Sequence, residues 1–111
     1  MKALLTAVLF AFTCAMLLAH AAPSTKSSRH SSQAAVRGRR IFYEDSCAGC
    51  HDTQGTMKLT GPNLKGLYHR RPRPVDAQIR TLIQHGKGNM PAFNYLSNSQ
   101  VNDLLAYLKS L

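Results

Sequence analysis

Two cysteines and a histidine stand together in the middle of the chain, as Cys47-Ala-Gly-Cys50-His51. In an exported protein, this C-x-x-C-H spacing is typical of covalent haem attachment, in which both thiols form thioethers and the histidine gives one axial bond to iron. One turn of backbone can bring two sulfurs to one edge of a macrocycle while the next side chain reaches its centre. The motif therefore predicts haem c at Cys47 and Cys50, with His51 as an iron ligand.

Three other chemistries use the same residue types. A zinc site needs a fourth ligand, and no second C-x-x-C or H-x3-H pair follows in the sequence. A thioredoxin-like dithiol requires a βαβ pattern, which the flanking residues lack. A structural disulfide between cysteines three residues apart would close a small and strained loop. Covalent haem attachment is thus the favoured interpretation.

The first residues have the organisation of an export signal. Lys2 supplies a positive charge, residues 3–18 form an apolar run of sixteen residues, and Ala19-His20-Ala21 has the small residues that signal peptidase accepts. We therefore predict that residues 1–21 are a cleaved signal peptide and that the protein is periplasmic. The alternatives are a membrane anchor, for which the run is short of the usual ~20 residues, and a lipid anchor at Cys14, which lacks the expected flanking residues.

The next segment, residues 22–37, has five serines, one threonine and three positive charges. So few apolar side chains cannot offset the entropy of ordering, and a flexible, Ser-rich basic leader is predicted. It is either a solvated spacer or a contact to an anionic membrane surface or an acidic partner.

Residues 38–111 remain as a single predicted domain of 74 residues. A domain of this size buries little surface and usually needs a metal, disulfide or cofactor, so haem binding and folding are expected to be coupled. It carries ten Lys and Arg against five acidic residues, within a chain whose formal charge is +9. No nucleic-acid motif accompanies this charge, so we expect acidic-surfaced protein partners and no nucleic acid.

Apolar spacing predicts helices around the site. A short one is expected over residues 39–46, before the cysteines. A second helix is expected over residues 75–85, with an apolar stripe formed by Val75, Ile79, Leu82 and Ile83. Pro74 suits its first helical position and Gly86 the position after its end. The last helix opens with the capping box Ser97-x-x-Gln100, followed by a stripe of apolar residues, Val101, Leu104, Leu105, Leu108 and Leu111.

An iron bound by His51 on one face needs its second ligand from the opposite face, after the chain has passed around the haem. Met90 lies 39 residues beyond His51, in a glycine-rich loop followed by Pro91. Met57, His69 and His85 are the competing candidates. Met57 is only six residues from His51, and His85 lies where it would complement a helix dipole.

Three motifs together resemble the small bacterial class I c-type cytochromes: C-A-G-C-H at 47–51, T-G-P-N-L-K-G-L at 60–67 and G-N-M-P-A-F at 88–93. The similarity covers residues 38–111. It implies an all-α fold of three to four short helices and loops wrapped around one covalently bound haem. It also implies that the C-terminal helix crosses the first helix through a glycine and an aromatic residue, for which Gly38 and Phe42 or Tyr43 are candidates.

The resemblance also assigns roles to residues around the haem. Pro62 would present its carbonyl to the second imidazole nitrogen of His51, which fixes the ring and strengthens its donation to iron. Met90 would be the second axial ligand, and Phe93 would pack at the haem edge. Arg70 would approach a haem propionate, the alternative being a solvent-facing charge.

With both axial positions filled by protein, little chemistry other than electron transfer remains, and no catalytic triad, paired carboxylates or phosphate loop is present. We therefore expect a non-enzymatic, monomeric, mono-haem electron carrier. Its partners would be a dehydrogenase or quinol-oxidising complex and a terminal oxidase or reductase, with membrane contact only through residues 22–37. The alternatives are a haem protein with a displaceable Met90, peroxidase-like or gas-sensing, and a dedicated cytochrome subunit of one oxidoreductase.

Overall fold

The computed structural model describes residues 25–111, and every regular element in that part of the chain is helical. The elements are α2 (Thr25–Glu44), η1 (Cys47–Gly49), η2 (Leu67–His69), α3 (Asp76–His85) and α4 (Asn98–Lys109), where η marks a 3-10 helix. Extended pairing within these residues is limited to one bridge between Lys87 and Met90. The predicted all-α fold is confirmed. No helix of the described part is long and apolar enough to span a bilayer.

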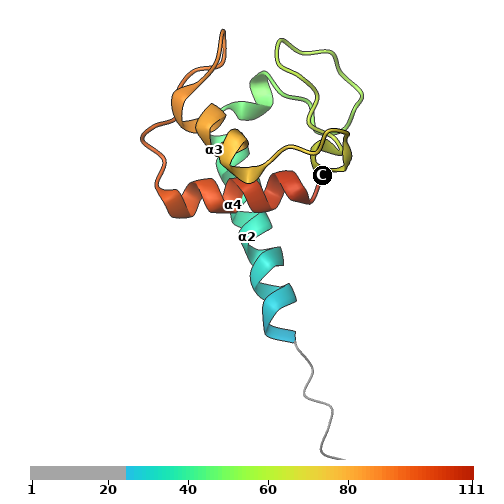
Figure 1. Ribbon diagram of the computed structural model, residues 1–111, viewed down its shortest axis with the longest axis vertical. Coiled ribbons are helices and arrows are strands. Elements are labelled where there is room, and N and C mark those ends of the chain that lie inside the picture. The colour runs from blue at the N-terminus through green and yellow to red at the C-terminus, as the bar shows by residue number, and fades with distance from the viewer. Residues whose placement is uncertain (1–24) are drawn as a thin grey trace, which may run out of the picture.

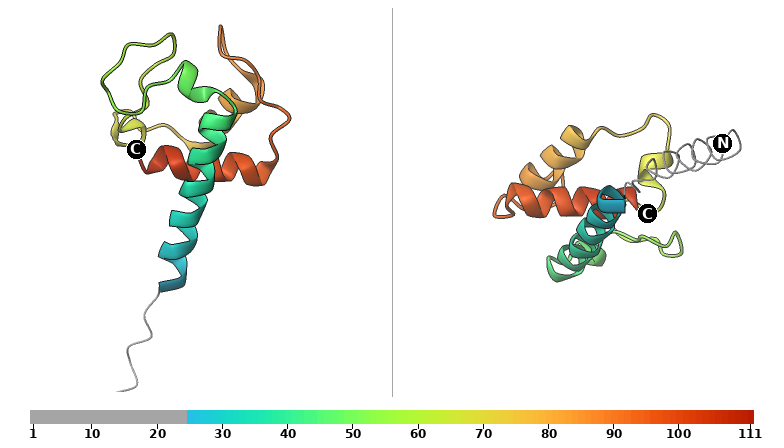
Figure 2. Two further views of the ribbon diagram at one scale, coloured as in Figure 1. Left: turned by 180° about the vertical axis from the view of Figure 1, so that it is seen from behind. Right: turned by 90° about the horizontal axis from the view of Figure 1, so that it is seen from below.

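The fold is organised by the crossing of α4 over α2 (Figures 1 and 2). Gly38 lies at the contact, where an added Cβ would come within 1.9 Å of the backbone oxygen of Asp103. One helical turn further on, the ring of Phe42 meets that of Tyr107 edge-on at 5.4 Å. Phe42 is 3% exposed and Tyr43 is 50% exposed, so the aromatic residue of the crossing is Phe42.

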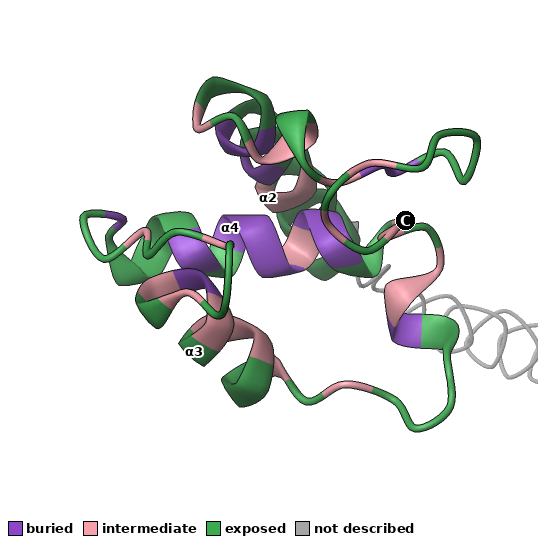
Figure 3. Ribbon diagram, turned by 90° about the horizontal axis from the view of Figure 1, so that it is seen from above, coloured by how far each residue is buried: buried purple, intermediate pink, exposed green. Residues whose placement is uncertain are grey.

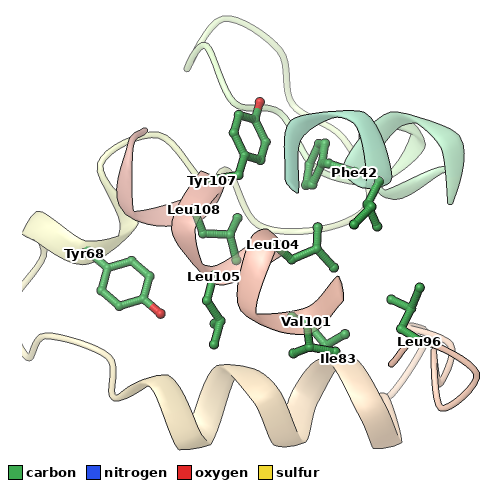
Figure 4. Close-up of a cluster of buried hydrophobic side chains, with 10 residues drawn as sticks. Phe42, Tyr68, Ile83, Leu96, Val101, Leu104, Leu105, Tyr107 and Leu108 are labelled. Atoms are coloured by element: carbon green, nitrogen blue, oxygen red, sulfur yellow. The ribbon is translucent and has the colours of Figure 1, made fainter. Parts of the chain in front are cut away.

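The hydrophobic core lies on both sides of α4, whose buried residues form an almost continuous band (Figure 3). Figure 4 shows Phe42 of α2 on one side of α4 and Ile83 of α3 on the other. The residues of this core are Ile41, Phe42, Tyr68, Ile83, Leu96, Val101, Leu104, Leu105, Tyr107 and Leu108. Four of the five predicted stripe positions of the last helix are therefore core, while Leu111 is only partly buried.

The prediction of a flexible leader over residues 22–37 is wrong from Thr25 onward, because α2 begins there. Residues 22–24 and the predicted signal peptide lie outside the described residues. Arg37 belongs to the domain, since its guanidinium donates two hydrogen bonds of 2.8 Å to the carboxylate of Asp103 on α4. Composition misled here because helix propagation needs no buried face once the packed half has nucleated the helix.

Serine, a poor residue for helix interiors, is accommodated in α2 by bonding to the helix itself. The hydroxyl of Ser31 lies 3.0 Å from the carbonyl oxygen of Ser28. The hydroxyl of Ser32 lies 2.8 Å from the carbonyl oxygen of Arg29. Such bonds to preceding carbonyls satisfy the side chain without ending the helix. At its other end α2 stops at Glu44, two residues short of the predicted helix, because Ser46 adopts a left-handed conformation with φ 63°.

Helix α3 begins one residue later than predicted. Val75 occupies the N-cap position with an extended backbone and is 58% exposed, so it does not belong to the apolar stripe. Pro74 consequently precedes the cap and is not the first helical residue. Gly86 ends the helix with φ 70°, as expected for a residue with no Cβ.

The predicted capping box of α4 is present. The backbone nitrogen of Gln100 donates to the Ser97 hydroxyl at 3.2 Å, and the Ser97 nitrogen donates to the Gln100 side-chain oxygen at 2.9 Å. Two of the otherwise unpaired amide groups of the first turn are thereby satisfied. This cap fixes where α4 starts, and hence which of its residues meet Gly38.

Candidate haem site

The C-x-x-C-H motif is a tight turn directly after α2. Ser46 reverses the chain, η1 carries Cys47, and the amide nitrogens of Cys50 and His51 both donate to the carbonyl of Cys47, at 3.1 and 2.9 Å. Cys47 is half-buried and Cys50 exposed, and both are free thiols. Burial, and then the nearby carboxylate of Asp45, raise the pKa of the Cys47 thiol.

His51 is held by the loop that follows it. Its Nδ1 lies 2.9 Å from the backbone oxygen of Pro62, the contact expected from the sequence. A carbonyl oxygen can only accept, so Nδ1 is the donor in this contact and Nε2 is the ring nitrogen left for a metal. The neighbouring Gly61 packs against the ring so closely that an added Cβ would lie 2.7 Å from Cε1 of His51. The imidazole is therefore oriented with one nitrogen free to bind a metal.

Met90 lies in a second tight loop, between α3 and α4. Its nitrogen and oxygen pair with those of Lys87, at 3.0 and 3.1 Å, and Gly86 packs against its carbonyl so closely that a Cβ there would approach to 2.4 Å. The nitrogen of Phe93 donates to the carbonyl of Ile83 at 2.9 Å and so closes the loop onto α3. Met90 and Phe93 are both partly buried against the core.

The competing ligand candidates are more exposed than Met90. Met57 is 60% exposed, and His69 and His85 are also exposed. The Met90 loop and the loop after His51 rise at the same end of the molecule, the end away from the start of α2 (Figures 1 and 2). A ligand from each loop could thus reach a common group.

Apolar residues that pack on the core but stay partly buried are available to contact a flat hydrophobic cofactor. Most of them come from η1, the loop after it, η2, α3 and the Met90 loop. These residues include Cys47, Ala48, Leu64, Leu67, Ile79, Met90 and Phe93. Two thiols, an oriented imidazole and a thioether complete the donor set that a covalently attached haem uses. Residues 25–111 contain no group of three or more His, Cys, Asp and Glu that could hold a metal, so the zinc alternative gains no ligands.

Arg70 makes contacts that the sequence did not predict. Its Nη2 donates to the backbone oxygens of Asn63 and Lys65, at 2.5 and 2.9 Å, so the guanidinium braces the loop that carries Pro62. Contact with a haem propionate stays a prediction.

The sequence did not predict two further sets of contacts near the site. Asp52 is buried and accepts several hydrogen bonds from the loop after it, and Tyr95 donates to Asp45 at 2.7 Å. The first has a signal in the sequence, because an aspartate followed by T-Q-G-T is typical of a turn closed by its side chain. The second joins residues fifty positions apart, and no local pattern predicts it.

We predict that Tyr95→Phe lowers the stability of the holoprotein, because it removes the hydrogen bond from the Tyr95 hydroxyl to Asp45. The bond to Asp45, followed by desolvation, raises the pKa of Tyr95 above its ordinary value of 10.0. The stabilisation is therefore present below pH ~10 and is lost as the pH rises through the folded pKa. Denaturant unfolding at neutral and alkaline pH measures the effect, with the exposed Tyr43→Phe as control. Equal losses in both variants would contradict this role.

Several known proteins are similar to this chain in sequence. Residues 33–108 match the family described as cytochrome C oxidase, cbb3-type, subunit III. The chain is 30% identical over 102 residues to cytochrome c-551 of Bacillus subtilis, covering 82% of each. It is 34% identical over 87 residues to cytochrome c oxidase subunit 2 of Alkalihalophilus pseudofirmus, and 28% identical over 95 residues to a nitric oxide reductase subunit of Stutzerimonas stutzeri. These matches cover 69% and 78% of the chain but only 25% and 64% of the two larger proteins.

A helical fold built on one helix crossing, with C-x-x-C-H directly after the first of the two helices, defines a small class I c-type cytochrome. The chain belongs to the cytochrome c family whose model is described as cytochrome C oxidase, cbb3-type, subunit III. Its cofactor is accordingly covalently bound haem c with iron.

We predict that Cys50→Ala leaves haem attached through a single thioether. The vinyl group that cannot react stays conjugated with the macrocycle, so the absorption of the denatured, pyridine-bound haem should shift to longer wavelength. The haem should also be extracted into acidified organic solvent faster than from the native protein. An unshifted spectrum together with unchanged extraction would rule out Cys50 as an attachment point.

Proposed function

We propose that this protein is a mono-haem electron carrier, with haem attached at Cys47 and Cys50 and with His51 and Met90 as axial ligands. The observation that carries the proposal is the 2.9 Å contact between Nδ1 of His51 and the oxygen of Pro62. It leaves Nε2 as the nitrogen available to iron and makes the imidazole a stronger donor.

The bound haem would supply an iron centre that gains or loses one electron. The chain's residues would hold that centre in place: His51 and Met90 would fill both axial positions, and partly buried residues such as Leu67 and Phe93 would exclude water. A filled coordination sphere leaves no position for a substrate, which supports electron transfer over catalysis.

Export is part of the proposal. Residues 1–21 would act as a signal peptide that delivers the chain to the periplasm, where haem is attached. Because Arg37 pairs with Asp103, we place the start of the cytochrome domain within α2 rather than at residue 38. The excess of Lys and Arg over acidic residues favours acidic redox partners, docked weakly and in a salt-sensitive way.

The proposal is tested on the periplasmic fraction of a host equipped for cytochrome maturation. A reduced-minus-oxidised spectrum and a haem-stained denaturing gel should show a c-type haem that migrates with the mature chain. Reduced protein should resist carbon monoxide at neutral pH, since Met90 occupies the sixth position. Rapid carbon monoxide binding would indicate a displaceable Met90 and overturn the carrier assignment.

A second candidate is a dedicated subunit of one oxidoreductase. It is favoured by two relatives that are named as an oxidase subunit and a reductase subunit, of which this chain covers 25% and 64%. Affinity purification of the tagged chain from its own host discriminates between the two. A stable stoichiometric complex with a large oxidoreductase supports the subunit, and recovery of the free cytochrome supports the diffusible carrier.

A further inference from the structure

The most heavily hydrogen-bonded side chain near the site is Asp52, which follows His51 directly and is 4% exposed. Its Oδ1 accepts from the backbone nitrogen of Gln54 at 2.9 Å. Its Oδ2 accepts from the backbone nitrogens of Thr56 and Met57, at 2.7 and 2.9 Å. A buried carboxylate with three backbone donors fixes the conformation of the residues that supply them.

A fourth donor connects this carboxylate to the far end of the loop. Nδ2 of Asn63 donates to Oδ2 of Asp52 at 2.9 Å. The chain is also tied back at two backbone positions, where Leu64 donates to the oxygen of Asp52 at 2.7 Å and Gly61 to the oxygen of Cys50 at 2.8 Å. The loop after His51 is thus closed upon the residues around the imidazole.

Asn63 is the immediate neighbour of Pro62, whose oxygen accepts from His51. Residues 52–63 lie outside the helices, so no helical hydrogen bonds hold the Pro62 carbonyl in place. The bond from Asn63 to Asp52 is the side-chain contact that ties this carbonyl to the segment bearing the imidazole.

We propose that Asp52 is a positioning residue for the axial histidine: through Asn63 it holds the Pro62 carbonyl against Nδ1 of His51. The inference rests on the proposed role of His51 as an iron ligand. The same carboxylate accepts a hydrogen bond from the backbone nitrogen of Met57 and so also fixes the backbone at this methionine, within the loop after His51.

The test is Asp52→Asn in the haem-loaded protein. Three donors converge on Oδ2 and one on Oδ1, and an amide offers a single acceptor, so at least one donor must face an NH2 group. We expect the Nδ1 proton of His51, followed by NMR in the reduced protein, to exchange with water about tenfold faster, as for the loss of one ordinary hydrogen bond. The reduction potential should rise, because a less strongly donating imidazole stabilises oxidised iron less.

A second variant keeps the test decisive if Asp52→Asn does not accumulate. Asn63→Ala leaves the three backbone donors of Asp52 intact and removes the side-chain connection between Asp52 and the neighbour of Pro62, together with the bond that the Asn63 side-chain oxygen accepts from the Lys65 nitrogen. It should change proton exchange and potential in the same direction. Asp76→Asn is the matched control: that carboxylate pairs with Lys109 at 2.5 Å, so its loss should alter stability but not the His51 proton.

The possible outcomes separate this inference from the proposed function. If the ring protons of His51 show the large upfield shifts of a haem ligand, while exchange and potential stay as in the native protein in Asn63→Ala, Asp52 is not a positioning residue. If those upfield shifts are absent from the native holoprotein, His51 is not the axial ligand and the proposed function itself fails.

Discussion

Replacing Gly38 with alanine should destabilise the protein by about 3 kcal/mol or more, because the crossing of α2 and α4 has no space for a methyl group. A Cβ at Gly38 would lie 1.9 Å from the backbone oxygen of Asp103 and 2.9 Å from the nitrogen of Leu104. Both atoms belong to the backbone of α4, so no side-chain rotation relieves the overlap. The helices must separate, which also weakens the contact between Phe42 and Tyr107.

The sign of the effect makes this prediction decisive. Within an exposed helix, Gly→Ala stabilises by roughly 0.5–1 kcal/mol, so helix propensity alone predicts the opposite change. Denaturant unfolding of the holoprotein, followed by circular dichroism, measures the difference. Gly49→Ala serves as control, since a Cβ there would have no neighbour within 4 Å. A Gly38→Ala variant as stable as the native protein would mean that the two helices do not cross at this residue.

Met90→Ala should abolish the near-infrared sulfur-to-iron charge-transfer band of the oxidised holoprotein. It should also lower the reduction potential by on the order of a tenth of a volt or more, because thioether ligation favours reduced iron. The vacated position would then be open to carbon monoxide in the reduced state. Optical spectroscopy and a redox titration of the purified holoprotein measure these changes.

Met57→Ala is the matched control, because it removes the same chemical group from an exposed position on the loop after His51. Its near-infrared band and potential should equal those of the native protein. If the band instead survives in Met90→Ala and disappears in Met57→Ala, Met57 is the sixth ligand. The fold would then have to bring the loop after His51 around to the opposite face of the haem.

Local signals were the most informative part of the sequence. The attachment motif depends on spacing within five residues, and the capping box of α4 on spacing within four, so both can be read without knowledge of the fold. The His51–Pro62 contact was expected only through the resemblance to known cytochromes, since it joins residues eleven positions apart across an irregular loop.

Signals based on composition were less reliable. Residues 25–37 have the polar content of a disordered segment, yet they continue the helix whose other half packs on α4. Val75 has the right spacing for the stripe of α3 but lies at its N-cap, where the backbone is extended and the side chain leaves the helical face. For residues 25–37 the packing of α4 on the other half of the helix decided the outcome, and a sequence window does not contain that element.

The sequence by itself determined the chemistry of this protein, because covalent haem attachment needs only thiols and an imidazole at fixed short spacing, and the family follows from that motif with two others. The tertiary structure alone decided that Phe42 rather than Tyr43 packs at the crossing and that Arg37 pairs with Asp103. It also decided that Asp52 accepts hydrogen bonds from the loop after His51. Two of these depend on contacts between residues more than sixty positions apart. Such contacts arise when α4 closes upon α2, and no local pattern in the chain encodes them.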